Sequence, residues 1–192
     1  NDDSFYRMDK SFSLGCCDAN LFDYNGVSNY ASTENVENLK FLKKLGVRHK
    51  WMWAKYTTNT PLATEALLGF RYILTNRENA KGYEAIGEGD GIKYYRNQYA
   101  LPVLFPVNDF ENFDLDELND FQLLNQIWAS INGLQEDIFT PNTVSNTSHD
   151  GENQLTVTVE NAGSLYLLIP TRSSYTSFKV TGARREREIR YD

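Results

Sequence analysis

The sequence has few of the residues from which metal centres and redox sites are built. Its 192 residues include two cysteines and two histidines. His49 and His149 lie far apart in the chain, and neither stands in a zinc-binding spacing or near a cysteine pair. Cys16 and Cys17 are adjacent, so a disulfide between them would form a strained ring, and we expect free thiols. We therefore expect no metal and no cofactor.

Long hydrophobic runs, an excess of basic charge and the short motifs of common enzymes are also missing. The longest apolar runs, such as residues 165–169, fall far short of the roughly 20 residues of a membrane-spanning helix. The formal net charge of −7 argues against a surface that binds nucleic acid. Residues 87–91 (GEGDG) lack the spacing of a dinucleotide-binding fingerprint. We expect a chain that does not itself span a bilayer, with no nucleic-acid partner and no catalytic residue of its own.

Two amphipathic helices are predicted at residues 34–45 and 121–132, where apolar residues recur with helical spacing. Each segment is preceded by residues that cap helix N-termini and is followed by a glycine, which favours a left-handed stop. The expected caps are Ser32 or Thr33 for the first helix and Asn119 or Asp120 for the second, and the expected stops are Gly46 and Gly133.

Short segments rich in aromatic and β-branched residues predict strands. Glycines at positions 87, 89 and 91 are expected to separate the second strand from the third. The polar residues 141–153 are expected to form a loop. The strands are expected at residues 70–74, 81–86, 92–96, 155–159, 165–169 and around 178–180.

The whole pattern predicts an α+β fold in two parts. Residues 1–108 are expected to form a mixed helix and strand part, and residues 109–192 a helix followed by a β-sandwich-like C-terminal sheet. One continuous domain is the alternative.

Tryptophan and tyrosine side chains cluster at residues 51–56. On a strand, Trp51, Trp53 and Lys55 would lie on one side and Tyr56 on the other. Two indoles on one side make a stacking platform of the kind that binds sugars, and the same two indoles would equally fill a core. Both interpretations stay open.

An acidic run at residues 109–120 is the remaining cluster whose side chains could bind a metal ion or take part in catalysis. Its carboxylates are of the type that ligates calcium or forms a glycosidase pair. The run lacks the central glycine of a calcium-binding loop, and the favoured interpretation is a solvated connection that places negative charge at the start of the following helix.

Six pieces of the chain, in this order, resemble the YfhO family of bacterial multi-spanning membrane proteins, in the part similar to its large extracytoplasmic region. Together they cover roughly residues 5–140. They are residues 5–9 (FYRMD), 20–32 (NLFDYNGVSNYAS), 43–47 (KKLGV), 67–74 (LLGFRYIL), 94–105 (YYRNQYALPVLF) and 123–139 (LLNQIWASINGLQEDIF).

The resemblance implies a function that the residues alone do not show. Such proteins are similar to membrane glycosyltransferases that use a polyprenyl-phosphate-linked sugar and decorate teichoic acid polymers outside Gram-positive cells. Their catalytic carboxylates belong to loops near the membrane helices, so no catalytic residue is carried over to this chain. We expect a soluble extracytoplasmic domain of such a protein, with the membrane-embedded part of the same protein and an envelope glycopolymer as its partners.

The resemblance also draws attention to Asn20 and Tyr30, which fall in its 20–32 piece. Turn chemistry is the other interpretation of that polar segment. The candidate carbohydrate-binding residues are Trp51, Trp53, Tyr56, Tyr30 and Asn20. Two alternative functions are a secreted carbohydrate-binding module and a glycoside hydrolase that uses the carboxylates of residues 109–120.

Overall fold

The computed structural model describes residues 4–50, 52–56, 60–76, 82–108, 113–133, 135–149, 155–159, 166, 177–180 and 187–190. The chain divides into two compact units, Asn1–Pro141 and Asn142–Asp192. Helices and mixed sheets occur together, so the predicted α+β class is confirmed. The division falls after residue 141, and the boundary that we expected after residue 108 therefore differs from it.

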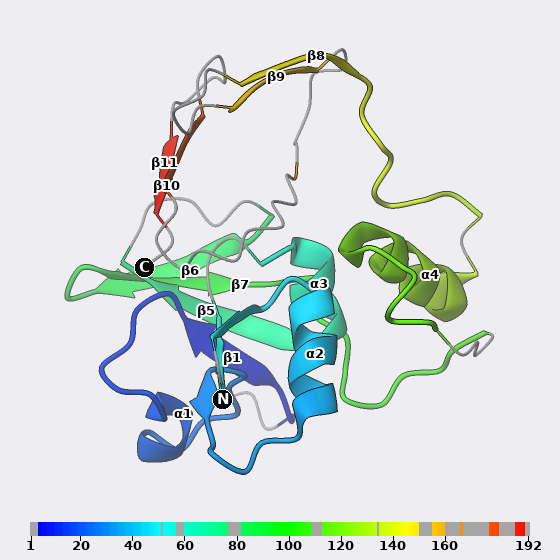
Figure 1. Cartoon of the computed structure of the whole chain (residues 1–192). Coiled ribbons are helices and arrows are strands. Elements are labelled where there is room, and N and C mark those ends of the chain that lie inside the picture. The colour runs from blue at the N-terminus through cyan, green and yellow to red at the C-terminus, as the bar shows by residue number, and fades with distance from the viewer. Residues whose placement is uncertain are drawn as a thin grey trace. The chain divides into compact units, whose positions relative to one another are not determined.

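A four-stranded mixed sheet is the framework of the first unit, in the order β1-β5-β7-β6 (Figure 1). Strand β1 (Arg7–Lys10) runs parallel to β5 (Phe70–Thr75). Strands β5, β7 (Ile92–Arg96) and β6 (Glu84–Gly89) are antiparallel neighbours. The strands predicted at residues 70–74 and 92–96 are confirmed.

Strand β6 corrects the expectation that glycines end the second strand. Gly87 and Gly89 lie within the strand and pair with β7. A Cβ at Gly89 would lie 3.0 Å from the Tyr94 hydroxyl, and one at Gly87 would lie 3.4 Å from the Tyr94 ring. These glycines therefore make room for the Tyr94 ring, and the strand continues through them to the turn at Asp90.

A second, three-stranded antiparallel sheet lies along the chain between β1 and β5. Its order is β2-β4-β3, formed by β2 (Asn29–Tyr30), β4 (Trp53–Lys55) and β3 (Arg48–Lys50). The short helices α1 (Asp18–Leu21) and α3 (Leu62–Leu67) belong to the same connection. A parallel pair such as β1 and β5 needs a long crossover, and this connection provides it.

Helices α2 (Val36–Lys44) and α4 (Asp120–Asn132) correspond to the two predicted helices and lie near each other (Figure 1). The Asn119 side chain and Gln122 form a capping box on α4, and Gly133 ends the helix with a φ of 65°. The cap of α2 is Asn35, whose side chain accepts the Glu37 amide at 2.8 Å.

The N-cap expected at Ser32 or Thr33 was therefore wrong. The Glu34 amide donates to the Ala31 carbonyl at 3.1 Å, so residues 31–34 form a turn before the helix begins. Asparagine caps helices as well as serine does, and Asn35 takes the role. The predicted stop at Gly46 is confirmed by its φ of 82°.

Helix α4 packs in the first unit. Leu123, Leu124 and Ile127 form a buried cluster with Leu45, which follows α2. The Lys44 ammonium donates to the Leu118 carbonyl at 2.7 Å, which joins the same two regions. This contact explains why the division of the chain lies after α4.

The described strands of the second unit pair two by two. Strand β8 (Val144–His149) is antiparallel to β9 (Leu155–Val159), and β10 (Ser177–Val180) to β11 (Arg187–Arg190). The strands predicted at 155–159 and around 178–180 are confirmed. The loop expected at residues 141–153 was wrong for Val144–His149, because these residues form β8 and pair with β9. The strand predicted at 165–169 falls almost wholly outside the described residues, and the sandwich-like sheet stays a prediction.

A buried carboxyl group lies beside the core of the four-stranded sheet. Glu65 of α3 is 3% exposed and accepts a hydrogen bond from the Tyr83 hydroxyl. Tyr56 also hydrogen-bonds to it and packs with Phe70 and Ile73. Burial raises the pKa of Glu65 to about 7, although the two tyrosine hydrogen bonds act in the opposite direction.

This pKa predicts that the unit is less stable at alkaline than at acidic pH. Between the ordinary pKa of 4.5 and about 7, the folded chain keeps a proton on Glu65 that the unfolded chain has lost. Raising the pH from 4.5 to 8 should therefore lower the free energy of unfolding by about 3 kcal/mol through this group. Urea unfolding of Glu65→Gln and the parent across this range measures the difference. An identical pH dependence in the two chains would contradict the assignment.

Candidate functional site

The Asp9 carboxylate, at the end of β1, is fully buried and fully hydrogen-bonded. One oxygen accepts the Lys10 amide at 2.9 Å and the Ser28 hydroxyl at 3.0 Å. The other accepts the amides of Val27 at 3.0 Å and Ser28 at 2.9 Å. Asp9 is 0% exposed, so these four bonds replace the water that the carboxylate would have in solution.

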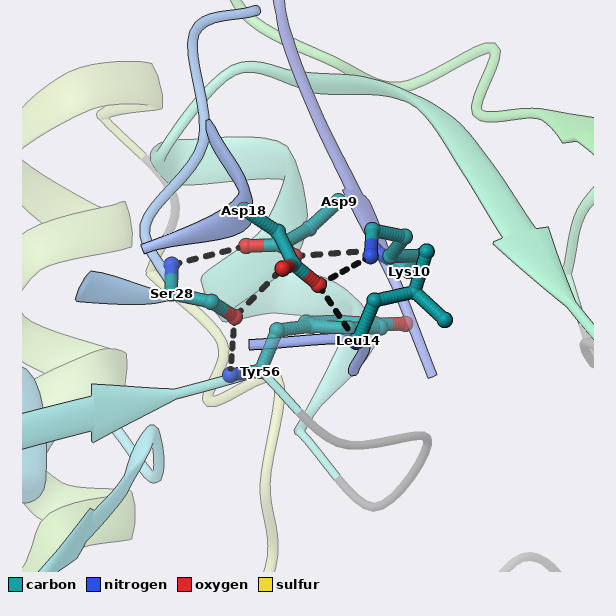
Figure 2. Close-up of polar contacts among 6 residues, drawn as sticks. All are labelled: Asp9, Lys10, Leu14, Asp18, Ser28 and Tyr56. Atoms are coloured by element: carbon teal, nitrogen blue, oxygen red, sulfur yellow. Dashed lines mark hydrogen bonds and ion pairs between the residues drawn. The ribbon is translucent and has the colours of Figure 1, made fainter. Parts of the chain in front are cut away.

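Ser28 connects this carboxylate to the three-stranded sheet. Its hydroxyl donates to Asp9 and accepts the Tyr56 amide at 2.9 Å (Figure 2). Tyr56 directly follows β4, so β1, the 23–28 loop and the end of β4 meet at one buried carboxylate. The position of Trp53 on β4 is fixed through this link.

Lys10 and Asp18 form a buried ion pair next to Asp9 (Figure 2). Their side chains are 8% and 5% exposed. The Lys10 ammonium also lies 5.0 Å from the centre of the Phe12 ring and 5.5 Å from that of Phe22. The same Asp18 oxygen accepts the Leu14 amide at 2.8 Å, which ties the 11–17 loop to α1.

The pair and its neighbours have shifted acidities. Burial raises the pKa of Asp9, and the hydrogen bonds from Lys10, Ser28 and Val27 offset only part of that effect. Burial would also raise the pKa of Asp18, but the hydrogen bonds from Lys10 and the Leu14 amide outweigh it and hold the pKa low. Asp18 is therefore a carboxylate at neutral pH.

A small cavity of about 10 Å³, room for one water-sized group, opens beside this cluster. Asp18, Tyr24, Trp53 and Lys55 are among its lining residues. Within the described part of the chain, three buried polar atoms of these residues have no hydrogen-bond partner: Asp18 Oδ1, the Tyr24 hydroxyl and Trp53 Nε1. Three residues that line the cavity thus carry a buried acceptor, a hydroxyl and an indole donor without a partner, which are the groups that a small polar ligand could bind.

An aromatic pair adjoins the cavity. Tyr30 of β2 is the antiparallel partner of Trp53 of β4, so the two side chains lie on the same face of the sheet. Tyr30 is 40% exposed. The Lys55 ammonium lies 5.3 Å from the centre of the Trp53 ring and adds a positive charge.

Of the five residues proposed from sequence to bind carbohydrate, the structure brings Trp53 and Tyr30 together. Asn20 is exposed on α1, the helix whose preceding residue Cys17 donates from its thiol to the Tyr30 carbonyl at 3.4 Å. Tyr56 lies apart from them in the core and is 3% exposed. Trp51 lies outside the described residues.

The chain was compared with models of protein families, with curated proteins and with solved structures. The family described as bacterial membrane protein YfhO matches residues 1–192, the whole chain. The chain belongs to the YfhO family. No curated protein and no solved structure matches it.

Among the residues that the structure describes, no helix is both long and apolar enough to cross a bilayer. Among the same residues, no group of three or more histidine, cysteine, aspartate or glutamate side chains is placed to hold a metal ion. Cys16 and Cys17 are free thiols, as predicted.

The described part of the acidic run forms turns in this YfhO chain. The Asp114 carboxylate accepts the Asp116 amide at 2.9 Å and the Glu117 amide at 3.3 Å. Asp120 lies in the first turn of α4, where a negative charge favours the helix. These contacts agree with a connection that caps the helix, the interpretation favoured from sequence.

Sequence reasoning missed the polar residues of the cavity. Lys10 and Asp18 lie outside the six pieces of the resemblance, Tyr24 was not singled out within the 20–32 piece, and their meeting depends on the pairing of β1 with β5 and on the path of residues 11–28. The one available signal was the 20–32 piece, which contains Tyr24 but neither Lys10 nor Asp18 and which drew attention to Asn20 and Tyr30 instead.

The ion pair predicts strong energetic coupling between Lys10 and Asp18. Lys10→Met leaves a buried carboxylate without its cation and should lower the free energy of unfolding by about 3–5 kcal/mol. Adding Asp18→Asn to Lys10→Met should restore a large part of that loss. Urea unfolding of the two single variants and the double variant measures the coupling.

The exposed pair Lys40 and Glu37, with side chains 61% and 70% exposed, is the matched control. The corresponding variants, Lys40→Met and Glu37→Gln, should change the free energy of unfolding little, because water already solvates both charges. Additive losses at Lys10 and Asp18 would show that the buried pair is not coupled and would contradict this description of the site.

Proposed function

We propose that this chain is the extracytoplasmic part of its membrane protein and positions a teichoic-acid-type glycopolymer for glycosylation by the membrane-embedded part. Membership of the YfhO family supports the membrane context. The catalytic groups are assigned to that other part, so the role proposed for this chain is binding.

The observation that carries the proposal is the Tyr30 and Trp53 pair beside a cavity with unpartnered polar atoms. Sugars present flat faces of C–H groups, which pack on aromatic rings, and hydroxyls, which both donate and accept hydrogen bonds. A sugar stacked on this pair would place one hydroxyl where Trp53 Nε1 and Asp18 Oδ1 lack partners.

Charge gives the site a second recognition element. Teichoic-acid-type polymers carry phosphate groups, and the chain as a whole has a net charge of −7. Lys55, beside the Trp53 ring, supplies a local positive charge at the platform. Lys10 is already paired with Asp18. Added salt should therefore weaken binding, because it screens the attraction between Lys55 and the phosphate groups.

The other candidate residues have different places in this proposal. Asn20, which is exposed on α1, and Trp51, which lies outside the described residues, stay candidates from the sequence. Tyr56 helps to position β4, because its amide donates to the Ser28 hydroxyl and its ring packs in the core.

The test is a calorimetric titration of the 192-residue chain with purified teichoic acids, with and without their sugar substituents. Saturable binding of the sugar-bearing polymer is expected. Trp53→Ala and Tyr30→Ala should each weaken it about tenfold, which corresponds to one lost stacking contact. Trp51→Ala tests the residue that the structure does not describe.

Trp128→Phe is the matched control, because Trp128 lies on α4 and is not among the cavity-lining residues. This variant should bind the polymer like the parent chain. Circular dichroism confirms that each variant is folded. If no polymer binds, or if Trp53→Ala binds as tightly as the parent, the proposed site is wrong.

A further inference from the structure

A second surface of the first unit has an unusual composition. Residues 97–108 (NQYALPVLFPVN) follow β7 and contain no charged residue, in a chain in which 23% of residues are charged. The segment forms neither helix nor strand. Because the segment is not a helix, its lack of charge is not explained by an apolar helix face that packs on the core.

The apolar side chains of this segment point largely to solvent. Leu104 is 88% exposed, Val103 50% and Val107 45%. Tyr99, an aromatic residue with a polar end, is 62% exposed. Single exposed apolar residues are common, but several within nine positions form a patch, and such patches mark interaction sites.

Hydrogen bonds to three elements hold the segment in place. The Asn97 amide donates to the Arg71 carbonyl of β5 at 2.8 Å, and the Leu101 amide to the Ala66 carbonyl of α3 at 2.9 Å. At the far end, the Asn108 amide donates to a carbonyl of α4 at 2.9 Å. Val103, Leu104 and Val107 therefore lie between fixed points at residues 101 and 108, and Tyr99 lies between those at residues 97 and 101.

Two prolines make this segment suited to a medium with little water. Pro102 and Pro106 have no amide hydrogen, so the apolar stretch carries fewer donors that would lose water on leaving the solvent. The absence of charged side chains removes the largest cost of entering a lipid interface. Tyrosine is enriched at that interface.

We propose that residues 97–108 dock into the interface of the lipid bilayer, with Leu104 and Val103 reaching toward the acyl chains. The chain belongs to a family of bacterial membrane proteins, which supports a bilayer as the occupant, and this step rests on the extracytoplasmic placement proposed above. A second copy of the chain is a less suitable occupant, because two chains with a net charge of −7 each repel one another.

The proposal predicts how docking responds to charge. Docking is driven by the burial of apolar side chains, and the segment has no charge with which to attract anionic headgroups. The depth of insertion should therefore be insensitive to salt. Because one short segment binds a bilayer weakly, it acts where a membrane protein already holds it close to the surface.

The experiment places an environment-sensitive fluorophore on the segment. Cys16 and Cys17, the chain's two cysteines, are replaced by serine, and Leu104→Cys is labelled with nitrobenzoxadiazole. The 192-residue chain is held on phosphatidylcholine vesicles by a C-terminal histidine tag and a nickel-chelating lipid. Fluorescence is expected to rise at least about twofold, and spin-labelled lipids should quench it.

Ile86→Cys, labelled in the same way, is the matched control, because Ile86 is an apolar residue of β6 that is 49% exposed. Its fluorescence should not change on the vesicles. A second variant, Val103→Asp in the Leu104→Cys chain, should abolish the rise at position 104 without unfolding an exposed segment. Loss of the signal in this variant would show that insertion depends on the native apolar surface.

Two results would overturn the proposal. In the first, the label at position 104 responds to vesicles no more than the label at position 86. In the second, it responds to protein concentration in the absence of lipid, which would assign the surface to a second copy of the chain. Retention of the signal in 1 M salt supports docking by apolar burial.

Discussion

The first unit depends on one buried carboxylate. Asp9 is 0% exposed and is kept in the interior by four hydrogen bonds from the Lys10 and Val27 amides and from Ser28. A buried charge without those partners would cost several kcal/mol, so the backbone around it has little freedom. Through Ser28, this constraint reaches the Tyr56 amide and fixes β4 relative to β1.

The candidate site is a consequence of that constraint. The same turn that supplies the Val27 and Ser28 amides leads into β2, which pairs Tyr30 with Trp53. Nearby, the Lys10 and Asp18 pair uses one Asp18 oxygen and leaves Oδ1 unpartnered next to the cavity. The hydrogen-bonded interior thus positions the strands that carry Tyr30 and Trp53, and it contains buried polar atoms that have no partner among the described residues. A site that is already rigid loses less conformational entropy of its own when a ligand binds.

Local signals predicted helices α2 and α4 and strands such as β5, β7 and β9, and long-range pairing decided much of the rest. Asn119 and Gly133 mark α4 because caps act within a few residues. Trp53 and Tyr30 were each identified from sequence, but their pairing depends on the two-residue strand β2, which no periodicity reveals. Val27 and Ser28, two of the three residues that donate to Asp9, lie 18 and 19 positions away, and no spacing rule connects such residues. The exposed loop at 97–108 was visible as composition, whereas its exposure required the fold.

A glycopolymer that binds as proposed contacts the indole of Trp53. A ¹H–¹⁵N spectrum of the labelled chain contains one indole signal for each of its three tryptophans, and single Trp→Phe variants assign them. Titration with a sugar-bearing teichoic acid fragment should shift the Trp53 signal, because Nε1 gains a hydrogen-bond partner, and leave the Trp128 signal in place. Binding of the fragment with an unmoved Trp53 signal would contradict the account.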